Sequence, residues 1–200
     1  CFCRESVTPV EHFAKGENLN HFTIPMENPA ASVYVIYSGT SDYTMRKGIM
    51  MDIFSQIMDI VYTETIREQE GGTYGVGTSS DINHMNNEWM FLFGFDTNVE
   101  KQEYLKNRAK EELMKVVVNG VREEDFNKVK EYMLKQYDNN LRENSYWMGV
   151  LSNRVFNNNT EIGYKQALES ISPKELNRFL RSLFLDNENL VEVVMCGEAK

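Results

Sequence analysis

The sequence has few cysteines and no long apolar run. Its three cysteines are an odd number, and two of them, Cys1 and Cys3, lie at the start of the chain. This pattern predicts neither a disulfide framework nor a paired CxxC zinc site. The densest apolar stretch, Trp89 to Phe95, has seven residues, far short of the roughly 18–20 that a membrane-spanning helix requires. We therefore expect no membrane partner.

Basic residues are also scarce relative to acidic ones. The chain has 21 Lys and Arg against 30 Asp and Glu, a formal net charge of −9. A nucleic-acid-binding surface needs clustered Lys and Arg, so we expect no nucleic-acid partner. With 200 residues, 42% of them hydrophobic, the chain can bury the core of one domain of ordinary size. It begins with Cys1 rather than Met, and we expect it to be an excised part of a longer protein.

The first part of the chain divides into a lead-in and the start of a domain. Residues 1–20 mix charge with Pro and Gly without periodicity, and we interpret them as a lead-in or linker. Residues 21–200 are predicted to form a single α+β domain. A short strand, His21–Met26, is followed by Ala31–Ser38, a β-branched and aromatic run that is apolar on both faces. Such a run predicts a buried central strand.

A long amphipathic helix is predicted next, from about Tyr43 to Glu68, because apolar residues recur there three and four positions apart. The pair Gly71-Gly72 ends it. Two strands, Tyr74–Ser80 and Trp89–Asp96, follow, and the turn residues between them predict an antiparallel hairpin.

The last part of the chain is mostly helical. The run Thr97-Asn98-Val99-Glu100 matches a capping box, which opens a helix that ends at Asn119-Gly120. Further helices are predicted around residues 123–137, 147–155 and 172–183, and Leu190–Met195 closes the chain as a strand. Antiparallel strands with helices gathered to one side indicate an α+β fold, with a mainly antiparallel sheet covered on one face by helices.

Histidine spacing excludes the common helical zinc motifs. The three histidines are His12, His21 and His84, and no two of them lie four positions apart. An HExxH or HxxEH pair needs that spacing to place both imidazoles on one face of a helix. No serine lies in a GxSxG motif either. We therefore predict no metal ligand and no catalytic residue in this chain.

The segment from Arg67 to Tyr74 carries the candidate binding residues. Arg67 lies in the last turn of the long helix, and Tyr74 follows the pair Gly71-Gly72. Two glycines allow a tight reversal, which can bring the guanidinium and the phenol together as hydrogen-bond donors to a peptide carbonyl. The alternative is that Arg67 neutralises the helix C-terminus, Tyr74 is a core residue and the glycines are ordinary turn residues.

The same segment resembles a family signature. The run TETIREQEGGTYGV, residues 63–76, is similar to the Arg…Tyr signature in the C-terminal half of M16-family zinc metallopeptidases, the pitrilysin, insulinase and processing-peptidase group. The seven-residue spacing between Arg67 and Tyr74 matches the signature. The order of predicted strands and helices around it matches as well, and the resemblance covers residues 23–197, nearly the whole chain.

The resemblance implies an M16/LuxS-like metallohydrolase domain and a role within a larger enzyme. It implies that zinc and its HxxEH helix lie in N-terminal catalytic domains of the same protein, and that Arg67 and Tyr74 of the present chain bind the backbone of a peptide or protein substrate. Because HxxEH is missing here, we expect this chain alone to be inactive.

Two other interpretations stay open beside this one. The chain can be an inactive M16-like scaffold used for subunit assembly, without a peptidase role, or a free-standing peptide-binding module. A face that neighbouring domains normally cover would also allow the chain to associate with itself. The sequence is compatible with a bacterial periplasmic or a cytoplasmic location.

Overall fold

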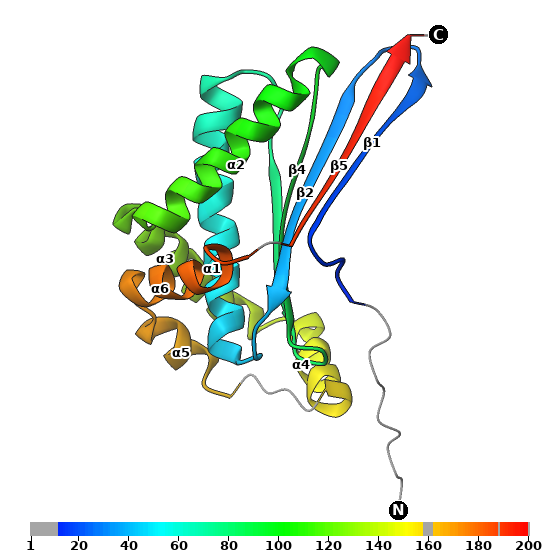
Figure 1. The fold of residues 1–200 in the computed structure, drawn as a ribbon. Helices are drawn as coiled ribbons and strands as arrows, with labels where there is room; N and C mark the ends of the chain where they lie inside the picture. Colours follow the sequence, from blue (N-terminus) through cyan, green and yellow to red (C-terminus); the bar gives the residue numbers. More distant parts are fainter. Residues whose placement is uncertain (1–11, 158–161, 188, 200) are drawn as a thin grey trace, which may run out of the picture.

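The computed structural model describes residues 12–157, 162–187 and 189–199. Residues 1–11 of the predicted lead-in, with Cys1 and Cys3, lie outside the described residues. A sheet with helices packed against one face makes up the molecule (Figure 1), which confirms the predicted α+β fold. The strands are β1 (Glu17–Met26), β2 (Ala31–Thr40), β3 (Gly77–Asn83), β4 (Glu88–Thr97) and β5 (Leu190–Ala199). The helices are α1 (Met45–Tyr62), the π-helix η1 (Thr63–Gln69), the short 3₁₀ turn η2 (Val99–Lys101), α2 (Gln102–Asn119), α3 (Glu123–Asn140), α4 (Asn144–Asn157), α5 (Tyr164–Ser170) and α6 (Pro173–Phe184).

The sheet has five strands in the order β1-β5-β2-β4-β3. Only β1 and β5 pair in parallel among the described strands, and the other pairs are antiparallel. β3 and β4 form the predicted hairpin. β1 already begins at Glu17, within the range interpreted as a lead-in.

Strand β2 lies at the centre of the sheet, but only one of its faces is buried. Val33 faces the helices, opposite Phe95 of β4 and Val194 of β5, and all three are buried. The next residue, Tyr34, points to the other face and is 48% exposed. The predicted central position of β2 is confirmed, but its predicted burial holds for one face only, because the helices cover a single face of the sheet and leave the other open (Figure 1).

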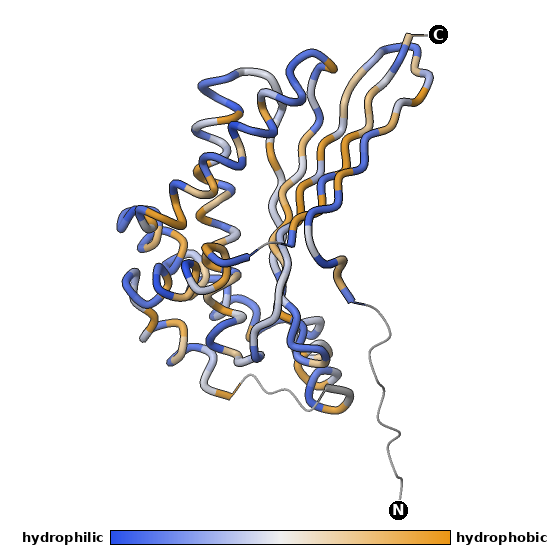
Figure 2. The backbone as a smooth tube through the Cα atoms, viewed as in Figure 1, coloured by the Kyte–Doolittle hydropathy of each residue, from blue (hydrophilic) through white to orange (hydrophobic). Residues whose placement is uncertain are grey.

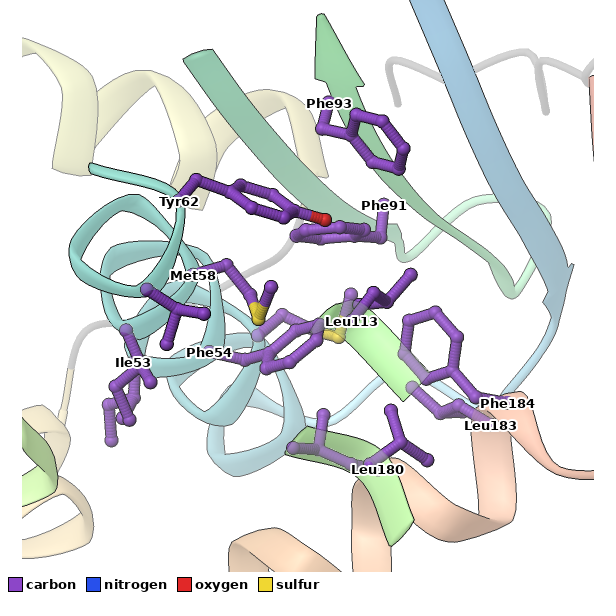
Figure 3. Packing of buried hydrophobic residues seen from close by; sticks show 14 of the residues in the cluster. Ile53, Phe54, Met58, Tyr62, Phe91, Phe93, Leu113, Leu180, Leu183 and Phe184 are labelled. Atoms are coloured by element: carbon purple, nitrogen blue, oxygen red, sulfur yellow. The ribbon is translucent and has the colours of Figure 1, made fainter. Parts of the chain in front are cut away.

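Aromatic side chains fill the space between the sheet and the helices. Phe54 of α1 lies 4.8 Å from Phe91 of β4 and 5.6 Å from Phe184 of α6, measured between ring centroids, and Figure 3 shows this packing. Hydrophobic residues run along β2, β4 and β5, whereas β1 begins with hydrophilic residues (Figure 2). The core therefore lies between α1 and the central strands, and β1 is an exposed edge.

The start of α2 differs from its prediction. Thr97 is the last residue of β4, and its hydroxyl donates a hydrogen bond to the carbonyl oxygen of Gly72 at 2.6 Å instead of capping a helix. The 3₁₀ turn that follows has no side-chain cap. The predicted capping box was wrong, because the Thr97 hydroxyl has a partner from a distant part of the chain. The start of α6 is confirmed, since Ser172 accepts a hydrogen bond from the Glu175 amide and Pro173 is the first helical residue.

Helix α4 lies at one end of the sheet (Figure 1), and several of its apolar side chains are exposed. Trp147 is 46% exposed, and its indole N–H donates to the carbonyl oxygen of Leu141 at 2.9 Å. Met148, Leu151 and Val155 are each at least half exposed. We call these four side chains, Trp147, Met148, Leu151 and Val155, the α4 patch.

Candidate functional site: the loop between η1 and β3

The helix that carries Arg67 changes its geometry before it ends. α1 continues directly into the π-helix η1. In η1 the Thr65 hydroxyl donates a hydrogen bond to the carbonyl oxygen of Val61 at 2.7 Å. Such back-bonding competes with the regular helical ladder, and π-turns within helices are frequent at functional sites. Arg67 lies in η1 with an exposed side chain.

A glycine in the left-handed region ends η1. Gly71 has φ +58°, a conformation that a residue with a Cβ adopts only at a cost. Its N–H donates to the carbonyl oxygen of Arg67 at 3.2 Å, which closes the last turn in the manner of an αL cap. The first glycine of the predicted reversal thus turns the chain.

At the second glycine, Gly72, the loop packs closely against neighbouring elements. A Cβ on Gly72 would lie 2.6 Å from Cδ1 of Leu105 in α2, so no larger residue fits there without a shift. The Gly72 carbonyl accepts the bond from Thr97 at the end of β4. The chain is therefore held by α2 and β4 just before it reaches Tyr74.

A carboxylate anchors the end of η1 from the other side. Glu70 accepts hydrogen bonds from the Tyr104 hydroxyl at 3.0 Å and from Arg108 Nε at 3.4 Å, both in α2. The hydrogen bond to Glu70 raises the pKa of the Tyr104 phenol. The loop that follows Arg67 is thus fixed to α2 both by Glu70 and by Gly72.

Tyr74 projects from this anchored loop into solvent. Its side chain is 98% exposed. The residues on either side are ordered by a local turn, in which the Gly75 N–H donates to the Thr73 hydroxyl at 3.2 Å. Val76 is buried and fixes the loop to the core. The expectation that Tyr74 begins the next strand was wrong, because β3 begins at Gly77.

Tyr74 lines a surface depression of about 400 Å³, which we call the loop hollow. Arg67 does not line it, although its side chain is also exposed. Within the part of the chain that the structure describes, neither the guanidinium of Arg67 nor the phenol of Tyr74 has a hydrogen-bond or ion-pair partner. Their joint action on one substrate stays a prediction. The loop hollow is lined by Ala30, Gly71, Gly72, Thr73, Tyr74, Asp96, Thr97 and Asn98.

A second depression of about 400 Å³ lies on the open face of the sheet, and we call it the sheet hollow. Asp96 lines both hollows and is not among the site residues predicted from the sequence. The sequence signal for its position is the alternation of apolar and other residues along β4, which places Asp96 on the sheet face opposite Phe93 and Phe95. The sheet hollow is lined by Tyr34, Gly75, Gly77, Thr78, Leu92, Gly94, Phe95 and Asp96.

The described residues contain no fitting site for a catalytic metal. Among residues 12–157, 162–187 and 189–199, no three His, Cys, Asp or Glu side chains are grouped so that they could hold a metal ion. A search of the same residues found no helix with the length and apolar character that crossing a membrane requires.

Comparisons with known proteins give a consistent result. The profile of the family described as "Peptidase M16 inactive domain" matches residues 6–133. No curated protein matches the sequence.

The solved structures that resemble the chain include larger proteases. The periplasmic protease PqqL from Escherichia coli superposes with a TM-score of 0.80 at 16% identity, over 90% of this chain and 21% of that one. A protease from Helicobacter pylori has a TM-score of 0.78 at 14% identity, over 96% and 48% of the two chains. A peptidase M16 inactive domain from Pseudomonas fluorescens gives 0.75 at 16% identity, over 92% and 44%. The present chain thus spans less than half the length of each of these proteins.

Proposed function

The chain belongs to the family of M16 peptidase inactive domains, and from that premise we propose that it is the non-catalytic, substrate-contacting domain of a zinc-dependent endopeptidase. In this proposal Arg67 and Tyr74 donate hydrogen bonds to the backbone of a bound peptide or protein substrate. In the same proposal, zinc is held by N-terminal catalytic domains of a longer protein that contains this chain.

The observation that carries the proposal is the placement of Tyr74. A phenol that is 98% exposed gains nothing from burial, and the loop beneath it is nevertheless held by Gly72, Thr97 and Glu70. Exposed loop tips without a function are usually less constrained. A rigid backbone that presents an unpartnered donor is what a pre-organised binding group requires.

The chemistry follows from the donors themselves. A phenol and a guanidinium both donate hydrogen bonds. When a peptide bond is attacked, its carbonyl oxygen gains negative charge, and fixed donors aimed at that oxygen stabilise the transition state more than the ground state. Tyr74 and Arg67 would therefore act mainly on the rate of the chemical step.

The test is peptide cleavage by the longer protease that contains this chain. We expect Tyr74→Phe to lower kcat by about 10- to 1,000-fold, the effect of losing one oxyanion donor, with little change in KM or in folding. Arg67→Met should lower the same parameter. Tyr132→Phe, which removes the hydroxyl of another exposed tyrosine, should leave kcat unchanged. Wild-type cleavage by the Tyr74→Phe variant would overturn the proposal.

A second candidate function is assembly without a peptidase role. The observation that favours it is the α4 patch, whose apolar side chains face solvent in this chain and mark an interaction surface. An assembly domain predicts that Tyr74→Phe has no effect on the parent protein, whereas substitutions in the α4 patch disrupt its subunit contacts.

A further inference from the structure

The sheet hollow beside Tyr74 has the chemistry of a site for a basic side chain. We propose that the sheet hollow binds a lysine or arginine side chain of the peptide that Tyr74 contacts, with Asp96 as the residue that determines this specificity. The inference rests on the proposed function, because it takes its ligand to be that peptide.

Charge is the first observation. Among the residues that the structure describes, Asp96 is the only charged one that lines either the loop hollow or the sheet hollow. It lies opposite Ser32 in the β2–β4 register, and the Ser32 hydroxyl donates to its Oδ1 at 2.5 Å. Within the described part of the chain Asp96 forms no ion pair. One carboxylate oxygen is thus fixed by Ser32, and the side chain remains exposed to meet a cation.

The second observation is an aromatic wall beside this carboxylate. Tyr34 is 48% exposed and lines the sheet hollow together with Asp96. Its ring lies over Gly94, where a Cβ would come within 2.6 Å of Tyr34 Cδ1. Aromatic faces attract ammonium and guanidinium groups, and the aliphatic stem of Lys or Arg packs on apolar surface. An aromatic wall and a carboxylate together therefore select a long basic side chain.

The third observation is room that the fold itself does not use. A Cβ on Gly75 or on Gly77 would meet nothing within 4 Å, and neither glycine has a positive φ. Internal packing and backbone geometry therefore do not require glycine at either position. Both line the sheet hollow, one and three residues after Tyr74. Bare backbone at these positions leaves space for a peptide from outside.

The direct test is a titration of the chain followed by NMR. A blocked pentapeptide with lysine at its centre is compared with the same peptide carrying norleucine, which keeps the stem and removes the charge. We expect the lysine peptide to bind about fivefold more tightly, the size of a partly exposed ion pair with a cation–π contact, and to shift the Gly77 and Gly94 amides. Higher salt should reduce the difference.

Matched variants locate the effect. Asp96→Asn keeps an oxygen for the Ser32 hydroxyl and should make the two peptides bind equally. Asp81→Asn removes another exposed carboxylate, on β3, and should leave the preference intact. A Cβ at Gly77 would meet no atom within 4 Å, so Gly77→Val should occupy part of the hollow and abolish binding of the lysine peptide, while the far-UV and NMR spectra remain those of a folded protein.

The outcomes separate this inference from the proposed function. Equal binding of the two peptides to the wild-type chain, no binding of either at millimolar concentration, or a lysine preference that survives Asp96→Asn overturns the inference. Cleavage that is insensitive to Tyr74→Phe, together with Asp96-dependent lysine binding, removes the proposed function but leaves the basic side-chain site. Cleavage that depends on Tyr74, without any preference for the lysine peptide, overturns the basic side-chain site and supports the proposed function.

Discussion

Gly72 lies against Leu105 so closely that a Cβ on the glycine would come within 2.6 Å of the leucine Cδ1. This contact, with the hydrogen bond from Thr97 to the Gly72 carbonyl, presses the loop onto α2 and β4. Tyr74 follows two residues later, so its position depends on the contacts of Gly72 with Leu105 and Thr97. A side chain at Gly72 would therefore displace either Leu105 or the loop that carries Tyr74.

We expect Gly72→Ala to destabilise the chain by about 1–3 kcal/mol, the usual cost of forcing an extra methyl group into packed surroundings. Gly75→Ala is the matched control, because the added methyl meets nothing and φ is not positive there. It should be neutral or stabilise by about 0.4–1 kcal/mol, since alanine restricts the unfolded chain. Urea unfolding of the two variants gives both values. Equal stability of the two would contradict the close packing at Gly72.

Most of the fold was predictable from local patterns. The order of strands and helices, the β3–β4 hairpin and the Ser172 cap followed from periodicity and capping residues within short windows of sequence. The start of β3 could not be predicted in this way. The segment before Gly77 is held by contacts with α2 and β4, which lie far away in the sequence. Thr97 fits a capping box by spacing alone, and its actual partner, Gly72, is distant in sequence.

The candidate site was only partly predictable for the same reason. Arg67 and Tyr74 were predicted from the local pattern of one short segment and from its resemblance to a family signature, and both side chains are exposed. Asp96 could not be found in this way, because its position beside Gly75 and Gly77 depends on strand pairing. The exposure of Tyr34 likewise depends on which face the helices cover.

A buried carboxylate on β5 makes stability depend on pH. Glu192 is 5% exposed and contacts Lys106 Nζ at 2.8 Å and the ammonium group of Lys110, both from α2. Burial raises the pKa of Glu192, but the hydrogen bonds from the two lysines outweigh it and hold the pKa below the ordinary value of 4.5. A lowered pKa means that this contribution to stability is complete above pH 4.5 and is lost as the pH falls through the folded pKa.

We expect Glu192→Gln to lower the free energy of unfolding by about 3–5 kcal/mol at pH 7, because two lysines then lose their shared partner in a buried setting. The difference from wild type should shrink as the pH falls below 4.5, since protonated Glu192 no longer balances the lysines either. Glu103→Gln is the control, because Glu103 also pairs with Lys106 but its side chain is 56% exposed; its effect should stay below about 1 kcal/mol. Chemical unfolding of the wild type and of both variants at pH 7 and at pH 3.5 measures these free energies. If the difference between wild type and Glu192→Gln is the same at both pH values, Glu192 is not the source of the pH dependence.

The α4 patch should make the chain associate with itself when neighbouring domains are absent. Leu151 is 56% exposed at its centre, between Trp147 and Val155 on the same helical face. Burying one leucine side chain contributes about 1.5–3 kcal/mol, so we expect Leu151→Glu to weaken association by at least about tenfold in sedimentation equilibrium. Leu185→Glu changes a leucine that is 50% exposed at the end of α6 and should leave association unchanged. If both variants associate like the wild type, or if the wild-type chain is monomeric at high concentration, the α4 patch does not mediate contacts between copies of this chain.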